Sequence, residues 1–322
     1  MELLRIVAMS MILIYHFLVY CIYRFEWDRV EFRMWYPFLA CGMNLFFLLS
    51  GYFKIRLSVK SVLNLLILIL TFRILDVAVK CVTGGGTGSY VDLCSTVLRG
   101  WIDQYWFMKI YFILVMFSPM LNFILKRISL RQLRILMLLY TLYSVYSCYF
   151  GRNQGYTIWH AMYMYCMAHW LRVDEGLWAS VSTYTLSVLT LLTLVLTSVV
   201  YGAISSLPVM NYNSPLMVAA SVLFFMCFTR LHLQNGGVNR IAQAALGCYL
   251  LQESMMGDDI YVWQHEMAMS ALPLVYKCGI FALCFVAFWM ASYLITMLAR
   301  WIGGGVTARG ICCRRSITRY LE

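Results

Sequence analysis

An arginine and a histidine lie eleven positions apart in the first apolar run, at Arg5 and His16. At about 100° per residue this separation is three helical turns plus roughly 20°, so both side chains lie on one helix face, roughly 16 Å apart along the axis. A buried neutral histidine can act as a general base, and a guanidinium can bind an anion. The pair therefore predicts proton-transfer chemistry inside an apolar helix that has a cation near its start.

The same two residues also have a purely structural interpretation. His16 would then be hydrogen-bonded between helices, and Arg5 would anchor the cytoplasmic end of its helix. The two residues by themselves leave both interpretations open.

The composition around this pair is that of an integral membrane protein. Of the 322 residues, 62% are hydrophobic and 12% are charged, whereas soluble domains are about half apolar and about a quarter charged. This excludes a soluble enzyme, a secreted disulfide scaffold, a disordered chain and a dedicated nucleic-acid binder. The net charge of +11 comes from Lys and Arg in short loops between apolar runs. Such loops are typical of the cytoplasmic side, and they offer a docking place for an anionic co-substrate.

The elements that must position the pair are membrane-spanning helices of about 20 residues each. The sequence predicts an all-α transmembrane bundle of about ten spans. The predicted spans cover 3–23, 36–53, 61–79, 105–125, 133–150, 158–172, 178–201, 214–230, 241–257 and 278–300. Most Lys and Arg fall on one side if the N-terminus is inside, which predicts that both termini are cytoplasmic. With no long soluble insertion, we expect residues 1–322 to form a single transmembrane domain, with the first run retained as a signal anchor.

Polar residues inside the predicted spans are further candidates, because a charge at the bilayer centre costs at least about 2.5–3.5 kcal/mol. Asn44 is a buried donor and acceptor, and Ser50-Gly51 allows close helix approach, so this segment is interpreted first as packing. Arg73 and Asp76 are three positions apart and are expected to pair across one turn, favouring a structural ion pair.

Two further features of the sequence concern charge and metal binding. Glu253 has three possible roles: to order an acceptor hydroxyl, to pair with an arginine, or to mark the membrane interface. The sequence leaves all three open.

The twelve cysteines form no cluster with metal-ligand spacing, so no metal site is predicted.

Four segments, in chain order, resemble motifs of acyltransferase family 3, whose members are bacterial integral-membrane O-acyltransferases that modify surface polysaccharides. Arg5 and His16 match the Arg/Lys-to-His motif of its first helix. Phe46, Phe47, Ser50 and Gly51 resemble its second-helix FFxxSG motif. Trp106-Phe107 with Ser118-Pro119 resemble a Trp-Phe to Ser-Pro segment of the family, and Tyr249–Gln252 resembles its late YLIH segment. The sequence departs from the family at Gln252, where the family often has His, and in its reduced Arg-rich patch after the second helix.

The resemblance implies an acyl-CoA donor, most often acetyl-CoA, that is a co-substrate rather than a permanently bound cofactor. Its phosphates would be bound by the basic residues Arg5, Lys54, Arg56 and Lys60. His16 would act as general base or as a transient acyl carrier, with Arg5 as its partner in the catalytic motif. The acceptor would be a glycan or lipid-linked saccharide outside a bacterial inner membrane. The expected site-lining residues are Asn44, Phe46, Phe47, Ser50, Gly51, Arg73, Trp106 and Glu253.

A different class of function fits the same composition. A multi-pass transporter or flippase for a polysaccharide precursor would also have many spans and few charges within them. Such folds often carry paired Gly/Pro interruptions in two halves of the chain, and this sequence shows no such pairing. A sensor or structural membrane protein would leave the Arg5–His16 stripe unexplained.

Overall fold

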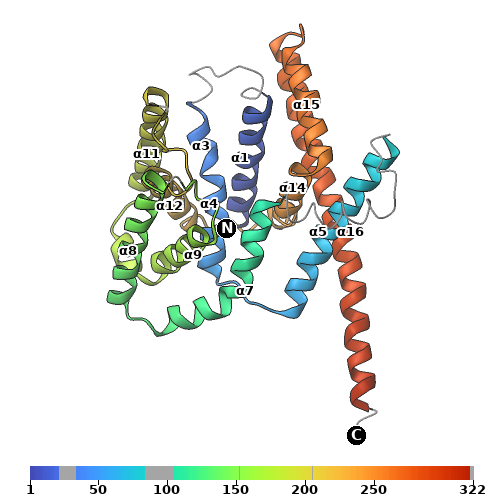
Figure 1. Cartoon of the computed structure of the whole chain (residues 1–322), viewed down its shortest axis with the longest axis horizontal. Helices are drawn as coiled ribbons and strands as arrows, with labels where there is room; N and C mark the ends of the chain where they lie inside the picture. The colour runs from blue at the N-terminus through green and yellow to red at the C-terminus, as the bar shows by residue number, and fades with distance from the viewer. Residues whose placement is uncertain (22–33, 84–104, 152, 205, 320–322) are drawn as a thin grey trace. The chain divides into compact units, whose positions relative to one another are not determined.

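The computed structural model describes residues 1–21, 34–83, 105–151, 153–204 and 206–319 (Figure 1). Every regular element in these ranges is an α-helix, as predicted, and they contain no strand. The chain contacts divide it into two compact units. The first consists of Met1–Arg56 with Trp106–Ala242, and the second of Leu57–Tyr105 with Gln243–Glu322. The prediction of a single domain over 1–322 stays a prediction.

The first unit holds ten of the described helices: α1 (Glu2–Cys21), α3 (Tyr36–Ala40), α4 (Gly42–Phe53), α7 (Trp106–Arg127), α8 (Leu130–Tyr149), α9 (Ile158–Val173), α10 (Glu175–Ala179), α11 (Thr183–Ala203), α12 (Pro215–Thr229) and α13 (Gly236–Ala242). The second unit holds four: α5 (Val59–Val82), α14 (Ala245–Gln252), α15 (Met255–Met269) and α16 (Leu274–Arg319).

Six of the described helical segments are long and apolar enough to cross a membrane. They are Glu2–Val19, Tyr36–Phe53, Val59–Val82, Trp106–Arg127, Thr183–Ala203 and Val275–Gly304. Helices α8, α9 and α12 coincide with predicted spans but are too short or too polar to belong to this group. The count of ten spans is therefore not confirmed, and the cytoplasmic placement of both termini stays a prediction. Residues 22 and 23 of the predicted first span lie outside the described residues.

The prediction of one continuous span over 241–257 is wrong. This stretch is divided among the end of α13, all of α14 and the start of α15. The chain turns sharply after Glu253, and Ser254 caps α15 by accepting a hydrogen bond from the Gly257 amide. A Cβ atom at Gly257 would collide with the carbonyl oxygen of Gln252, so the corner requires glycine. Average hydropathy does not detect such a corner.

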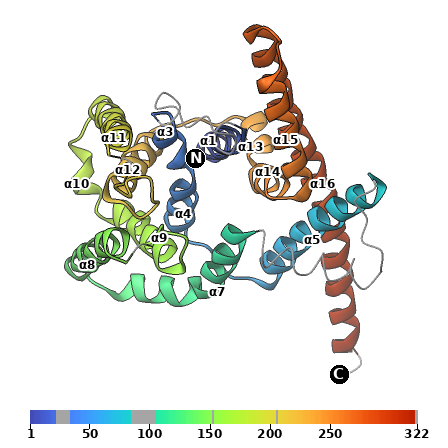
Figure 2. The same cartoon turned by 45° about the horizontal axis from the view of Figure 1, so that its top comes forward.

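Helices α4 and α9 form the buried centre of the first unit, and Figures 1 and 2 show them side by side. Every residue of α9 from His160 to His169 is buried. The two helices touch through their backbones, because a Cβ atom at Gly51 would collide with the backbone oxygen of Tyr165. The close helix approach predicted for Ser50-Gly51 is thus confirmed, and glycine is what permits it.

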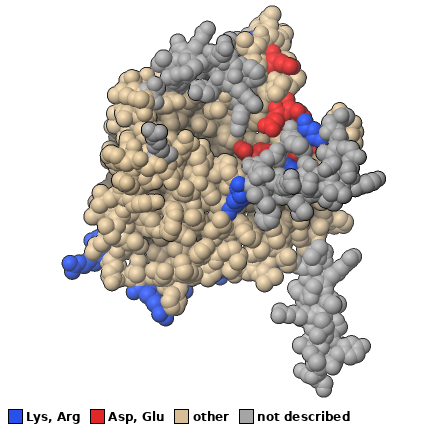
Figure 3. Space-filling view, in the orientation of Figure 1, with Lys and Arg blue, Asp and Glu red and all other residues tan. Residues whose placement is uncertain are grey.

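The outer faces of the long helices carry large apolar side chains. The exposed leucines include Leu138 and Leu142 on α8, Leu191 and Leu192 on α11, and Leu283 and Leu294 on α16. Most of the face seen in Figure 3 shows no charged side chain. A surface of this kind is unsuited to water and suited to lipid, which supports the membrane assignment made from composition.

Candidate functional site

A cavity of about 550 Å³ lies at the C-terminal ends of α4, α7 and α9. The polar residues of its wall are Lys54, Arg56, Asn122, Lys126, His169 and Arg172. Four of these are cations at neutral pH, and none of the described residues in the wall is acidic. We refer to this feature as the basic cavity. Its charge makes it a site for a ligand with several negative charges.

Asparagine and arginine side chains hold the chain around the basic cavity. Asn122 Nδ2 donates to the Ile55 carbonyl at 2.9 Å, and its Oδ1 accepts from the Tyr165 hydroxyl at 2.8 Å. Arg172 donates to the Tyr52 carbonyl at 2.8 Å. Lys54 itself has φ 55°, the one positive φ at a non-glycine residue in the described part of the chain. A strained backbone held by neighbouring side chains is typical of functional sites.

The cations of the basic cavity repel one another. Burial, and then the charges of Arg172 and Lys126, hold the pKa of the Lys54 ammonium below its ordinary value. Asp174, the acid nearest to Arg172 in sequence, is occupied elsewhere, because it accepts from Arg134 at 2.8 and 2.9 Å and from Trp170 at 2.9 Å. The hydrogen bond from Arg134 is the main reason that the pKa of Asp174 lies below its usual range. A bound anion would relieve the repulsion among the cations.

His169 adds a neutral polar group to the wall of the basic cavity. Its Nε2 lies 3.3 Å from the Leu125 carbonyl, which can only accept, so Nε2 carries the hydrogen. Its Nδ1 is buried without a hydrogen-bond partner. One ring nitrogen of His169, a residue of the cavity wall, therefore has no protein partner.

A second buried polar group lies at the N-terminal end of α9. His160 Nε2 is 2.9 Å from Asn44 Oδ1, across the contact between α9 and α4. Asn44 Nδ2 donates to the Tyr212 carbonyl at 3.0 Å and lies 3.3 Å from Ser221 Oγ. Asn44 is fully buried, as predicted, and it links α4 to α9, α12 and the turn before α12.

Comparison with known protein families decides the class of this protein. The model of the third acyltransferase family, described as an acyltransferase domain, matches residues 1–300. The chain belongs to acyltransferase family 3. No curated protein and no solved structure matches it. This membrane acyltransferase must bind an acyl donor and an acceptor, so the basic cavity and the polar groups of α9 can now be considered in those terms.

In the acyltransferase, Arg5 and His16 lie on one uninterrupted helix, α1, as the spacing predicts. Met9 and Ile12, which lie between them on the same face, are buried. Arg5 makes an ion pair with Glu2 at 2.9 Å and does not line the basic cavity. His16 is partly buried, with its ring centroid 5.7 Å from that of Tyr15. The catalytic role of His16 and the anion-binding role of Arg5 stay predictions.

The aromatic residues of the family motifs pack around α4. The rings of Phe46 and Phe47 both contact Phe107 of α7, with centroids 6.1 and 5.3 Å away. Trp106 packs edge-on against Tyr156 at 4.5 Å, which places it beside the N-terminal end of α9.

Ser50 is the polar member of the second-helix motif, and its hydroxyl has partners in α4 and in α7. Ser50 Oγ donates to the Phe46 carbonyl at 2.8 Å, one turn earlier in the same helix. The Ser50 side chain also forms a hydrogen bond with Tyr111 of α7, so it links α4 to a neighbouring helix, while Gly51 contributes the close contact with α9.

Three predicted site residues belong to the second unit. Arg73 pairs with Asp76 at 3.0 Å, as predicted, and both side chains are fully buried. The Arg73 guanidinium also lies 5.8 Å from the Tyr105 ring centroid. Glu253 accepts from Gln252 at 3.2 Å. Lys60 is exposed in the first turn of α5 and is not among the residues of the basic cavity.

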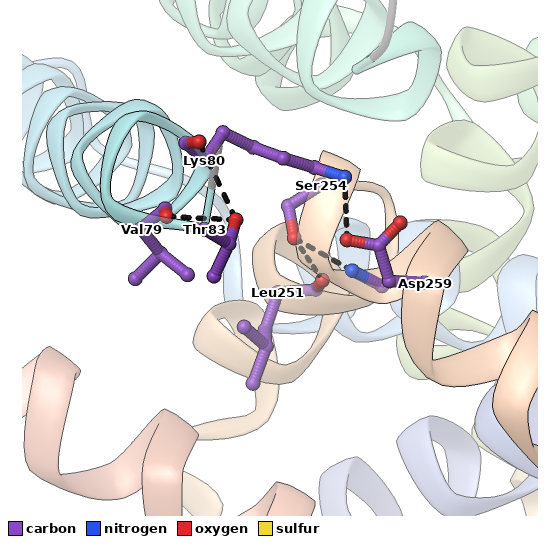
Figure 4. Close-up of polar contacts among 7 residues, drawn as sticks. Val79, Lys80, Thr83, Leu251, Ser254 and Asp259 are labelled. Atoms are coloured by element: carbon purple, nitrogen blue, oxygen red, sulfur yellow. Dashed lines mark hydrogen bonds and ion pairs between the residues drawn. The ribbon is translucent and has the colours of Figure 1, made fainter. Parts of the chain in front are cut away.

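A charged contact at the far end of α5 ties this helix to α15 in the second unit. Figure 4 shows Lys80 reaching from α5 to Asp259 on α15, beside the Ser254 cap. Thr83 closes the end of α5 by donating to the Val79 carbonyl at 3.0 Å. The contact fastens α15, the helix that begins after the corner at Ser254, to α5.

Lys126, His169 and Arg172 complete the basic cavity around Lys54 and Arg56, which sequence reasoning had selected. Lys126 was detectable as part of a basic segment after the fourth predicted span. His169 and Arg172 gave no such signal, because one lies within an apolar run and the other is a lone arginine at its end. A separation of nine residues places His160 and His169 on opposite faces of a helix, and the structure gives them different partners, on α4 and α7.

Proposed function

We propose that this membrane acyltransferase is an O-acetyltransferase of a bacterial inner membrane. It would take an acetyl group from cytoplasmic acetyl-CoA and transfer it to a hydroxyl of a surface polysaccharide or a lipid-linked sugar. The observation that carries the proposal is the basic cavity, which gathers four cations from the ends of three helices. Membership of the family supports acyl transfer as the reaction, and the charge of the basic cavity supports a CoA thioester as the donor.

The donor is the part of the reaction that matches the basic cavity. Coenzyme A carries a diphosphate and a further phosphate, which together need several cations. Arginine forks bind phosphate oxygens in pairs, and lysines contribute compact charges. The cavity volume of about 550 Å³ lies within the range of ligand sites. Because α4, α7 and α9 all end here, the predicted topology places the cavity on the cytoplasmic side, where acetyl-CoA is made.

The chemistry would take place at His16. The acceptor hydroxyl oxygen attacks the thioester carbonyl carbon, the C–S bond breaks, and the CoA thiolate leaves. The hydroxyl proton passes to the imidazole of His16 and from there to the thiolate sulfur. In the variant mechanism, the His16 ring nitrogen attacks first and carries the acetyl group to the hydroxyl. Arg5 would bind the anionic part of the donor nearest to α1.

Membranes carrying the protein provide the direct test. They are incubated with radiolabelled acetyl-CoA and the host's glycan fraction, with wild type, His16→Ala and His232→Ala at matched expression. His232 is an exposed loop residue and serves as the matched histidine control. We expect label in glycan with wild type and His232→Ala, and none with His16→Ala. Equal transfer by His16→Ala would remove His16 from the mechanism. Absence of transfer from any acyl-CoA would favour a transporter or flippase.

A further inference from the structure

A narrow cleft lies at the N-terminal end of α9, between α8, α9 and the turn before α12. Its wall includes Tyr140, Tyr143, Ser147, Trp159, His160 and Asn213. We call it the hydroxyl cleft. Its interior measures about 10 Å³, which is the space of a single water-sized group. A phosphate or a whole sugar ring does not enter such a space, whereas a hydroxyl group does.

Two buried hydrogen-bond acceptors in the wall of the hydroxyl cleft have no protein donor. They are His160 Nδ1 and Asn213 Oδ1, on side chains that are 5% and 3% exposed. Buried polar atoms are nearly always paired, and an unpaired one costs about 1–3 kcal/mol. Two such atoms lining the same cleft indicate a ligand that supplies hydrogen-bond donors.

The tautomer of His160 follows from the partners of Asn44. The Asn44 amide nitrogen faces the Tyr212 carbonyl and Ser221 Oγ, so its oxygen faces His160. An amide oxygen only accepts, and therefore His160 Nε2 carries the hydrogen. The neutral ring then has its lone pair on Nδ1. Asn44 thus fixes the tautomer of His160, a residue of the cleft wall, so that the unpartnered Nδ1 is an acceptor.

The rim of the hydroxyl cleft is aromatic and open. Tyr143 is 48% exposed and Trp159 is 55% exposed. Flat aromatic side chains together with the hydroxyl groups of the wall suit a ligand that has both apolar and hydroxylated faces, as a sugar has. A carboxylate or phosphate is disfavoured, because both unpaired atoms are acceptors.

We propose that the hydroxyl cleft is an acceptor subsite, in which sugar hydroxyl groups donate hydrogen bonds to His160 Nδ1 and Asn213 Oδ1 while the ring lies at Trp159 and Tyr143. This inference rests on the proposed function, because it names where that function's glycan is held. His160 is then an acceptor-binding residue, distinct from the residue that activates the hydroxyl. A water molecule can donate the same hydrogen bonds as a sugar hydroxyl. The experiment must therefore distinguish a bound sugar from a bound water in the cleft.

The full-length protein in lipid nanodiscs is compared with His160→Gln. The glutamine amide nitrogen still reaches Asn44, but the acceptor at the Nδ1 position is lost. We expect the KM for glycan to rise about tenfold with the KM for acetyl-CoA unchanged, as suits one lost hydrogen bond of a buried group. Tyr146→Phe, on the exposed face of α8 outside the cleft, is the matched control. Ser147→Val, which fills the cleft without touching Asn44, should reproduce the effect of His160→Gln if the latter variant folds poorly.

Equilibrium binding of the labelled glycan fraction gives a readout that does not depend on transfer. Weaker glycan binding by both cleft variants supports the subsite, even if wild type transfers no acetyl group, in which case the proposed function fails alone. If wild type transfers acetyl groups and both variants keep the wild-type glycan KM and glycan binding, the cleft holds only water. The inference is then overturned, while the proposed function stands. No glycan binding by wild type also overturns the inference.

Discussion

The two ends of α9 offer opposite chemistry. At its C-terminal end, the basic cavity gathers four cations without an acid in its described wall. At its N-terminal end, the wall of the hydroxyl cleft includes two neutral side chains that each have a buried acceptor atom without a protein partner. One histidine of α9 belongs to each end. The difference teaches that a single buried helix can separate binding of a charged donor from binding of a neutral acceptor.

The largest effect is expected for the proton transfer assigned to His16, which belongs to neither end of α9. His16→Ala should lower turnover by about 10²–10⁴-fold, the usual contribution of a general base, with the affinities for acetyl-CoA and glycan unchanged. Single-turnover transfer and equilibrium binding of both ligands measure this. A loss of either affinity would place His16 in one of the two binding ends instead.

Binding of acetyl-CoA at the basic cavity and of glycan at the hydroxyl cleft should both weaken when the contact between α4 and α9 is forced apart. Gly51→Ala adds a methyl group against the Tyr165 backbone, and overpacking of this kind destabilises by about 1–3 kcal/mol. We expect a lower Tm and poorer binding of both ligands. Gly176→Ala is the control, because no atom lies within 4 Å of its added Cβ. Equal Tm values for the two variants would show that the contact relaxes freely.

The basic cavity should respond to loss of a single cation without any change at the hydroxyl cleft. Lys126→Gln is expected to raise the KM for acetyl-CoA about tenfold, as suits one lost charge-assisted bond of about 1.5 kcal/mol, and to leave the glycan KM unchanged. Arg127→Gln is the matched control, because Arg127 stacks on Phe123 at 3.8 Å and does not line the cavity. Similar effects from the two variants would argue for general surface charge.

The smallest effect is a difference in pH dependence between the two ends. The lowered pKa of Lys54 means that this lysine loses its proton at a lower pH than an ordinary lysine, whose pKa is about 10.4. The acetyl-CoA KM should therefore rise a few-fold as pH increases through the alkaline range, and glycan binding should stay flat. Lys54→Arg should remove the rise, because arginine keeps its charge. A rise that persists in Lys54→Arg would assign the titration to another group.

Periodicity and charge made several of these features predictable. The continuous helix through Arg5 and His16 followed from its apolar run, and the pairing of Arg73 with Asp76 followed from a separation of three. The grouping of Lys54 with Arg56 at one end of a span followed from the clustering of basic residues after apolar segments.

The features that escaped prediction depend on which helices meet. Spacing places His160 and His169 on different faces of α9. It does not predict that Asn44 contacts His160, or that the Leu125 carbonyl contacts His169. The corner at Gly257 escaped for a related reason, because it depends on the carbonyl of Gln252 folding back against the glycine. Tertiary contacts of this kind leave no trace in the hydropathy of a single segment.

The backbone contact at Gly51 also has a mechanical consequence. Where helices meet through side chains, rotamer changes absorb small displacements; where they meet backbone to backbone, nothing between them can yield. We therefore expect small displacements of α4 to be shared by α9 where the two backbones meet. Arg172 joins the C-terminal end of this helix pair through the Tyr52 carbonyl, and the contact between Asn44 and His160 joins its N-terminal end, so the pair is fastened by side chains at both ends as well as by backbone between them.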